Sequence, residues 1–223
     1  MLKNTSILIT AGPTWEAIDP VRGISNHSSG KMGYALAQAA TELGANVTLI
    51  SGPVCLNEPP RVSTLNIQSA LELFEAVHQQ INTHQTDIFI SVAAVADYRP
   101  VSAQTQKIKK SADEITLTLV KNPDIVASVA ALKTRRPFTV GFAAETENVN
   151  SYARGKLEAK NLDMIIANDV SQAHIGFGSD QNHVTLITTD NELDLGQHDK
   201  STLANLILSH ISEQYQTYEK RTT

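Results

Sequence analysis

Short apolar runs alternate with helical stripes along most of the chain. Continuous runs rich in branched residues are typical of strands buried on both faces of a parallel sheet. They predict strands over Ser6–Ala11, Asn46–Ser51, Ile88–Val92, Phe138–Ala144 and Asp163–Asn168. Apolar residues spaced by three and four predict helices near 34–43, 69–81, 125–132, 150–160 and 201–218. This alternation predicts an α/β fold with a Rossmann-like, doubly wound, mainly parallel sheet and helices on both faces.

Two segments alternate strictly between apolar and polar residues. Ile115–Leu119 lies in a polar stretch, and its pattern predicts a strand with one solvated or partner-facing side. We therefore expect residues 98–122 to form an arm that leaves the main sheet. His183–Thr189 alternates in the same way, as an antiparallel edge strand would. The length supports one core, so a single domain over 1–223 is expected.

The segment Ser25–Gly33 stands directly before the first predicted helix and combines small hydroxyls, an amide, two glycines and a cation. Backbone N–H groups at a helix start and the positive end of the helix dipole favour a phosphate or carboxylate. Gly30 and Gly33 let a ligand approach the backbone, and Lys31 adds charge. The alternative is a helix whose Ser and Asn residues serve only as caps. The long loop before it, over 15–26, favours binding.

The carboxyl ends of the predicted strands meet near this helix start. Open α/β sheets bind their ligands at this edge. The first strand ends at Gly12, and the third passes into the small residues Ala93–Ala96, followed by Asp97. Small side chains leave room for a ligand against the backbone, with close packing as the alternative. Three cations gather beside Asp97, where they either form a solvated face or close over a polyanion: Lys107, Lys109 and Lys110.

Composition narrows the class of protein. With 41% hydrophobic residues, 18% charged residues and a net charge of -5, the chain resembles an ordinary soluble domain and shows no basic excess for nucleic acid. Cys55 is the only cysteine, which excludes an internal disulfide and a cysteine-rich metal cage. The apolar run Ile7–Ile9 is too short for a signal peptide core or a bilayer crossing. The cytoplasm is the expected location, with no membrane partner.

Several known motifs fail. The Gly30–Lys31 pair does not make a P-loop, because Ser25 and Met32 occupy positions that need Gly and a hydroxyl residue. Gly12 stands alone after the first strand, so the dinucleotide fingerprint is missing. The seven histidines show no ligand spacing, and no residue is predicted as a metal ligand. The remaining backbone, amide and lysine groups suit a site that positions phosphates and stabilises charge.

Six stretches, in order, resemble the phosphopantothenoylcysteine synthetases: ITAGPTWEAIDPVRGISNHSSGKMG, AAVADYRP, KIKK, VKNPDIV, GFAAET and NLDMIIANDVS. The match spans nearly the whole chain. The resemblance implies a bacterial-type ligase that joins 4'-phosphopantothenate to L-cysteine at the expense of CTP. In that chemistry the substrate carboxylate attacks the α-phosphate to give an acyl-cytidylate and pyrophosphate, and the cysteine amine then displaces CMP. Mg²⁺ would bridge the phosphates through nucleotide oxygens and water.

The resemblance also implies roles for individual residues. Asn26 would contact the acyl-nucleotide intermediate, Arg22 would shape the same loop, and Lys107 would close over the intermediate from a flap. Cytosine and ribose would lie against small residues and Asp97, and two lysines would hold the triphosphate. The residues implied to bind nucleotide are Gly12, Ser28, Ser29, Gly30, Met32, Ala93, Ala94, Asp97, Pro123, Asp124, Ile125, Val126, Phe142, Lys156 and Lys160.

The family forms homodimers to which the arm contributes, and the alternation at 115–119 supplies a physical reason, since an apolar face needs a cover. Many bacterial relatives carry the domain behind a flavin-dependent decarboxylase, which is the expected fusion or partner. The chain is then either one domain of a bifunctional protein or a stand-alone synthetase. Two alternatives are an NAD(P)-dependent reductase, against which the missing fingerprint counts, and a non-catalytic nucleotide-binding domain, which turnover would distinguish.

Overall fold

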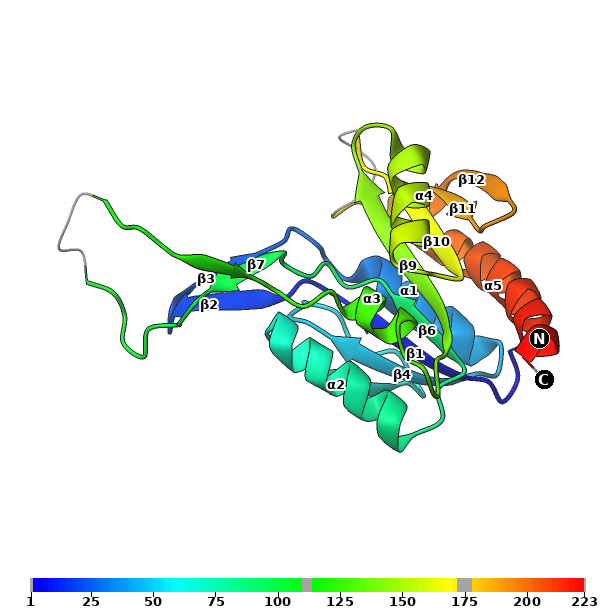
Figure 1. Cartoon of the computed structure of the whole chain (residues 1–223), viewed down its shortest axis with the longest axis horizontal. Helices are drawn as coiled ribbons and strands as arrows, with labels where there is room; N and C mark the ends of the chain where they lie inside the picture. Colours follow the sequence, from blue (N-terminus) through cyan, green and yellow to red (C-terminus); the bar gives the residue numbers. More distant parts are fainter. Residues whose placement is uncertain (1, 110–113, 172–177, 223) are drawn as a thin grey trace.

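One mixed sheet of eight strands organises the chain, in the order β12-β11-β10-β9-β6-β1-β4-β5 (Figure 1). The computed structural model describes residues 2–109, 114–171 and 178–222. The strands of the sheet are β1 (Ser6–Ala11), β4 (Asn46–Ser51), β5 (Ser63–Asn66), β6 (Ile88–Ser91), β9 (Phe138–Glu145), β10 (Met164–Asp169), β11 (Gln181–Ile187) and β12 (Glu192–Asp199). Pairing is parallel from β5 to β10 and antiparallel beyond it. The predicted α/β fold with a mainly parallel sheet is confirmed.

Helices cover both faces of this sheet. In the described ranges they are α1 (Lys31–Glu42), α2 (Ala70–Thr83), α3 (Ile125–Ala130), α4 (Val149–Ala159) and α5 (Lys200–Thr222). Ile7 and Ile9 of β1 pack in the cluster that holds α1 and α5, whereas Leu8 packs with α2 and α3. The α4 helix packs against β9 and β10 in a third cluster. Burial on both faces explains why the strands are continuous apolar runs.

The strand order reverses between β1 and β6, which are neighbours at the centre of the sheet. Ligands of doubly wound sheets bind outside the carboxyl ends of the strands at such a switch point. The α1 helix packs directly on the end of β1, since a Cβ at Gly33 would lie 2.5 Å from the Cβ of Ala11. The N-terminus of α1 is therefore held at the switch point.

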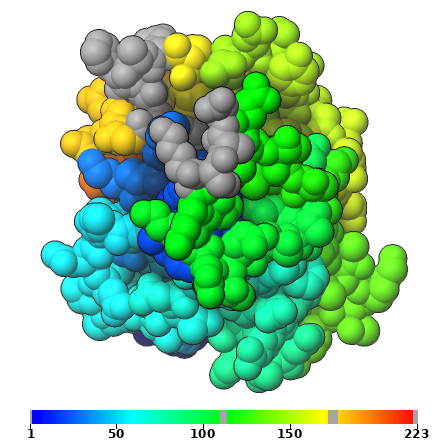
Figure 2. Space-filling model, turned by 90° about the vertical axis from the view of Figure 1, so that its left-hand side faces the viewer, coloured from blue at the N-terminus to red at the C-terminus, as the bar shows by residue number. Residues whose placement is uncertain are grey.

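Two small hairpins lie apart from the main sheet: β2 (Trp15–Asp19) with β3 (Arg22–Ser25), and β7 (Tyr98–Pro100) with β8 (Leu119–Lys121). The β2–β3 hairpin replaces the long loop expected there, and its turn closes on Asp19, whose carboxylate accepts the N–H groups of Val21 and Arg22, both at 2.9 Å. The second hairpin forms the base of an arm that extends away from the sheet (Figure 1). Figure 2 looks along this arm, which lies in green in front of the blue N-terminal residues.

The expected strand over Ile115–Leu119 is wrong, because pairing on this side of the arm begins only at Leu119. Ile115 is 60% exposed and Leu117 is 39% exposed, so the apolar face has no cover within the described part of the chain. The third lysine of the arm, Lys110, lies outside the described residues.

The strand expected over His183–Thr189 exists as β11, but it is not an edge strand, because β12 pairs with its outer side. Both β12 and β5 are edge strands with mostly exposed polar residues, so neither carries the apolar pattern of a buried strand. The α4 helix begins after Asn148, at φ +45°, and this cap lies two residues before the cap expected at Asn150. Of the loop expected over 169–182, residues 172–177 lie outside the described residues.

No described helix has both the length and the apolar character that a bilayer crossing requires.

Candidate active site

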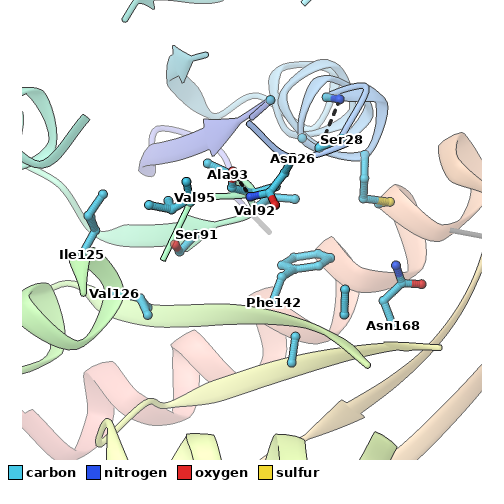
Figure 3. Close-up of a pocket in the computed structure, with 18 of the residues that line it drawn as sticks. Asn26, Ser28, Ser91, Val92, Ala93, Val95, Ile125, Val126, Phe142 and Asn168 are labelled. Carbon is cyan, nitrogen blue, oxygen red and sulfur yellow. Dashed lines mark hydrogen bonds between the residues drawn. The ribbon is translucent and has the colours of Figure 1, made fainter. Parts of the chain in front are cut away.

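A cavity of about 860 Å³ opens at the carboxyl ends of β1, β6, β9 and β10. Asn26 and all the residues predicted to bind nucleotide line it: Gly12, Ser28, Ser29, Gly30, Met32, Ala93, Ala94, Asp97, Pro123, Asp124, Ile125, Val126, Phe142, Lys156 and Lys160. Figure 3 shows Phe142 on the floor of this space, between Ile125 on one side and Asn168 on the other. The structure thus brings the predicted binding residues together, while their roles stay predictions.

Two buried threonines join the loops that follow β1 and β6. The Thr10 hydroxyl accepts the N–H groups of Val92 and Ala93 at 3.1 and 3.2 Å. The Thr14 hydroxyl accepts the N–H of Ala96 at 3.0 Å. Sequence reasoning missed both, because a Thr at a strand end looks like an ordinary strand residue. These bonds fix the small-residue loop in the wall of the cavity.

Asn26 is tied to the same loop. Its side-chain Nδ2 donates to the carbonyl of Ala94 at 2.9 Å, and the backbone N–H of Thr14 donates to that carbonyl at 3.2 Å. Figure 3 shows the Asn26 side chain reaching from the segment before α1 to the loop after β6, above Phe142. The hydrogen bond holds the amide of Asn26 at the switch point, where its other polar atom can meet a ligand.

The N-terminus of α1 carries no side-chain cap. Its N-cap is Gly30 at φ +78°, a left-handed conformation that favours glycine, and the first turn holds no acidic residue. Ser28 accepts the N–H of Gly30 at 3.3 Å, which lies before the helical amides. The alternative of a helix capped by its Ser and Asn side chains is therefore wrong. Lys31 and Met32 line the cavity, so the helix dipole favours an anion there.

Lys156 of α4 and Lys160, the residue directly after α4, are both paired with carboxylates. Lys156 Nζ lies 2.5 Å from Glu145 Oε1, and Lys160 Nζ lies 2.8 Å from Asp124 Oδ2. Both pairs are partly exposed, so each contributes little to the free energy of folding. A bound phosphate would compete with these carboxylates for the two ammonium groups.

Two of the predicted catalytic residues, Arg22 and Lys107, do not line the cavity. The Arg22 guanidinium lies 2.5 Å from Asp19 Oδ2 and donates to the carbonyl of Ile108 at 2.7 Å. Burial alone would raise the pKa of Asp19, but hydrogen bonds from Val21, Arg22 and Ile108 lower it to about 2. Lys107, beside Ile108, is exposed on the arm. The β2–β3 hairpin is therefore bonded to the arm at Ile108, the residue next to Lys107.

Sequence reasoning missed a polar group on the α5 side of the cavity. Three polar residues line the cavity here: Asn168, the last but one residue of β10, Asn182, the second residue of β11, and Lys200, the first residue of α5. The strand-end rule applied to β10 would have found Asn168. Nothing in the local sequence marks Lys200. Within the described ranges, no three His, Cys, Asp or Glu side chains gather as a metal ligand set.

The fold and the cavity define a doubly wound α/β domain with an uncapped helix N-terminus at its switch point. The chain belongs to the family described as the DNA/pantothenate metabolism flavoprotein C-terminal domain, whose profile matches residues 2–215. The missing dinucleotide fingerprint fits this class, since a hairpin stands between β1 and α1 where the fingerprint would need a short glycine turn.

Curated relatives are similar to this chain in sequence. The chain is 60% identical over 215 residues to the coenzyme A biosynthesis bifunctional protein CoaBC of Vibrio parahaemolyticus, covering 96% of this chain and 53% of that protein. The chain is 54% identical over 223 residues to the protein of the same name in Escherichia coli K12, and the match covers 99% of this chain and 54% of that protein. The chain thus spans about half the length of these curated relatives.

Solved structures agree as well. The crystal structure of the C-terminal domain of a CoaBC protein is 40% identical, with a TM-score of 0.81 and 98% of each chain covered. A Cab2 variant in complex with phosphopantothenate-cysteine shares the fold alone, at 15% identity and a TM-score of 0.81 over 99% of this chain and 89% of that one.

Proposed function

We propose that this domain is a phosphopantothenate–cysteine ligase of coenzyme A biosynthesis that uses CTP. The observation that carries the proposal is the cavity at the switch point, which is lined both by Asn26, bonded to the carbonyl of Ala94, and by the uncapped N-terminus of α1. Membership of the family and the names of the relatives support the same activity. No observation favours a nicotinamide-dependent reductase.

The reaction needs two displacements. In the first, a carboxylate oxygen of 4'-phosphopantothenate attacks the α-phosphorus of CTP, and pyrophosphate leaves. In the second, the amine of L-cysteine attacks the acyl carbon, CMP leaves with one former carboxylate oxygen, and the amine loses a proton to solvent. Neither displacement requires a covalent nucleophile from the protein. Both need the phosphates to be aligned and their charge neutralised.

The cavity residues are assigned roles on this basis. Ala93 and Ala94 hold the cytosine through their backbone, and Asp97 meets the ribose hydroxyls. Phe142 lies on the floor of the cavity and offers an aromatic face to the nucleotide. Asn26 contacts the acyl carbonyl, where the oxyanion forms. The first turn of α1 lies against the phosphates.

The lysines supply the charge. Lys156 and Lys160 exchange their carboxylate partners for triphosphate oxygens when CTP binds. Lys107 approaches from the arm and neutralises the α-phosphate. Mg²⁺ would be bound mainly through CTP and would offset part of the phosphate charge, because the described part of the cavity offers isolated carboxylates rather than a cluster that could hold the ion.

The arm is assigned to dimer formation. Ile115, Leu117 and Leu119 are apolar, alternate with polar residues and are between 39% and 60% exposed on the arm, so a second copy of the chain would cover the side that they share. Replacing Ile115 with Asp is expected to shift the protein from dimer to monomer in sedimentation velocity. An unchanged sedimentation coefficient would assign the dimer contact elsewhere or exclude it.

The domain is also assigned a place beside a flavin-dependent decarboxylase, which would act on the carboxylate that the ligase product carries. Turnover tests the central assignment. Purified protein supplied with CTP, Mg²⁺ and 4'-phosphopantothenate should release CMP in proportion to added L-cysteine. Absence of cysteine-dependent CMP release, with CTP bound, would leave a non-catalytic nucleotide-binding domain.

A further inference from the structure

A buried carboxylate joins the β2–β3 hairpin to the start of α2. Glu16, the second residue of β2, is 2% exposed and does not line the cavity. Its Oε1 atom accepts the backbone N–H of Ala70, the first residue of α2, at 2.9 Å. The neighbouring N–H of Trp15 donates to the carbonyl of Gln68 at 2.8 Å. Two hydrogen bonds therefore connect β2 to a helix that begins 54 positions after Glu16.

The α2 helix is capped without Glu16. Ser69 is its N-cap, and the Ser69 hydroxyl accepts the N–H of Glu72 at 3.2 Å. The Glu72 carboxylate accepts the N–H of Gln68 at 2.7 Å, so the local sequence already supplies a capping pair. Burying Glu16 at the same helix start removes a charge from water, a cost that capping alone does not require. What the Glu16 bond adds is a fixed position for β2.

A short series of contacts leads from β2 to Asn26. Trp15 of β2 is paired in the hairpin register with Ser25, the last residue of β3. The Ser25 hydroxyl donates to the carbonyl of Thr14, directly before β2, at 2.7 Å. Asn26 follows Ser25 in the chain and lines the cavity. The position of β2 therefore sets where the amide of Asn26 enters the cavity.

The loop on the other side of Asn26 is anchored to β1 and to the residue that follows it. The N–H of Ala94 donates to the carbonyl of Gly12 at 2.9 Å, and the Thr10 hydroxyl accepts two further N–H groups of the loop. Asn26 Nδ2 meets this loop at the carbonyl of Ala94. A shift of β2 would thus displace Asn26 relative to a wall that β1 keeps in place.

We propose that Glu16 is a positioning residue for Asn26: its bond to Ala70 fixes β2, and β2 fixes the amide of Asn26. This rests on the proposed function, in which Asn26 contacts the acyl carbonyl. A displacement of about 1 Å in a reacting group costs up to about a hundredfold in rate. Because the bond spans two elements, the length of the Glu16 side chain matters more than its charge.

Two conservative variants separate length from charge. Glu16→Gln keeps the length and an acceptor oxygen for Ala70, whereas Glu16→Asp keeps the charge but is one methylene shorter. We expect Glu16→Asp to lower kcat for cysteine-dependent CMP release by about tenfold, with the KM for CTP within about twofold of wild type. Glu16→Gln should keep kcat within about threefold of wild type. The opposite order would show that the charge at the helix start matters instead, and would overturn the proposal.

The matched control is Glu72→Asp, the same shortening at an exposed carboxylate of the same helix start. It should leave kcat unchanged, because Glu72 has no bond to the hairpin. A double-mutant cycle with Asn26→Ala shows whether Glu16 acts through Asn26. In the Asn26→Ala background, Glu16→Asp should lower kcat by less than about twofold. A full tenfold loss in that background would overturn the role through Asn26.

Ser25→Ala keeps the test decisive if Glu16→Asp does not fold. Ser25 is exposed, so removing its hydroxyl breaks the next contact toward Asn26 with little effect on folding. We expect kcat to fall by about threefold to tenfold. Full activity in Glu16→Asp, or in Ser25→Ala where Glu16→Asp does not fold, would overturn the role of Glu16 while the proposed function stands. Wild-type protein that releases no CMP would overturn both together.

Discussion

The Asp19 carboxylate accepts a hydrogen bond at 3.0 Å from the backbone N–H of Ile108, 89 positions further along the chain. The Arg22 guanidinium donates to the carbonyl of Ile108 at 2.7 Å, so both backbone groups of that residue are held. The backbone N–H of Gln104 also donates to the carbonyl of Ile18 at 2.9 Å. The β2–β3 hairpin therefore fixes the part of the arm that carries Lys107.

Removing the charge of Asp19 should release this part of the arm. In Asp19→Asn the amide cannot accept all the hydrogen bonds that the carboxylate accepts, so Ile108 loses a partner. We expect the Ile108 amide to exchange with solvent faster while amides of β6 keep their protection. Because Lys107 would be misplaced, kcat should fall by about tenfold with little change in the KM for CTP.

The control is Asp190→Asn, the same change at an exposed position after β11. It should leave exchange at Ile108 and kcat unchanged. If Asp19→Asn alters neither quantity, the hairpin does not position Lys107.

The free energy of unfolding at acid pH should depend on the ionisation of Asp19. The pKa of Asp19 is lowered in the folded protein from 3.8 to about 2, so its contribution to stability is present above about pH 4. The contribution is lost as the pH falls from about 4 to about 2, because the folded state must then be protonated against those hydrogen bonds. Urea unfolding across this range should therefore show a stability gap between wild type and Asp19→Asn that narrows with falling pH. A gap that stays constant would contradict the assigned pKa.

Asn26 should be essential for turnover but not for folding. In Asn26→Asp a carboxylate oxygen would face the carbonyl of Ala94, where Nδ2 now donates at 2.9 Å, and the added charge would oppose an oxyanion. We expect kcat to fall by about a hundredfold or more, as for loss of an oxyanion-stabilising donor. Thermal unfolding should shift by only a few degrees, with Asn46→Asp as the control. Wild-type kinetics in Asn26→Asp would remove Asn26 from the site.

If Lys156 binds the triphosphate as proposed, Glu145 must compete with phosphate for it. Glu145→Gln removes the carboxylate 2.5 Å from Lys156 Nζ and leaves the ammonium available to CTP. We expect the affinity for CTP to rise by a few-fold, since a partly exposed pair contributes up to about 1 kcal/mol. Glu158→Gln, on the same helix but outside the cavity, should leave CTP binding unchanged. Weaker binding of CTP to Glu145→Gln would mean that Lys156 does not contact the nucleotide.

The central strands could be predicted from sequence because burial on both faces leaves a continuous apolar run, as in Ile7–Ile9. The edge strands β5 and β12 could not, since exposure lets their residues be polar. The hairpin at Asp19 was missed because its turn depends on a carboxylate that accepts neighbouring N–H groups. The local pattern of apolar and polar residues therefore predicts which strands are buried, but it does not predict a turn that depends on one side chain.

Some residues of the candidate site could also be predicted from the sequence, and others could not. Residues just beyond the carboxyl end of a strand, such as Ala94 after β6, are marked by their position in the chain, whereas Phe142 lies within β9 and was predicted from the family resemblance. Lys200 is not, because it reaches the cavity only through the packing of α5 against α1, which carries Lys31. Contacts between residues so far apart in sequence leave no local signal.

The most direct test of the central claim follows one oxygen atom through the reaction. With ¹⁸O in the carboxylate of 4'-phosphopantothenate, attack on the α-phosphorus followed by amide formation transfers one labelled oxygen to CMP. Mass spectrometry of the nucleotide product, after turnover with CTP and L-cysteine, should therefore find CMP carrying one ¹⁸O per molecule of amide formed. Unlabelled CMP, or CDP with labelled phosphate, would contradict activation as an acyl-cytidylate.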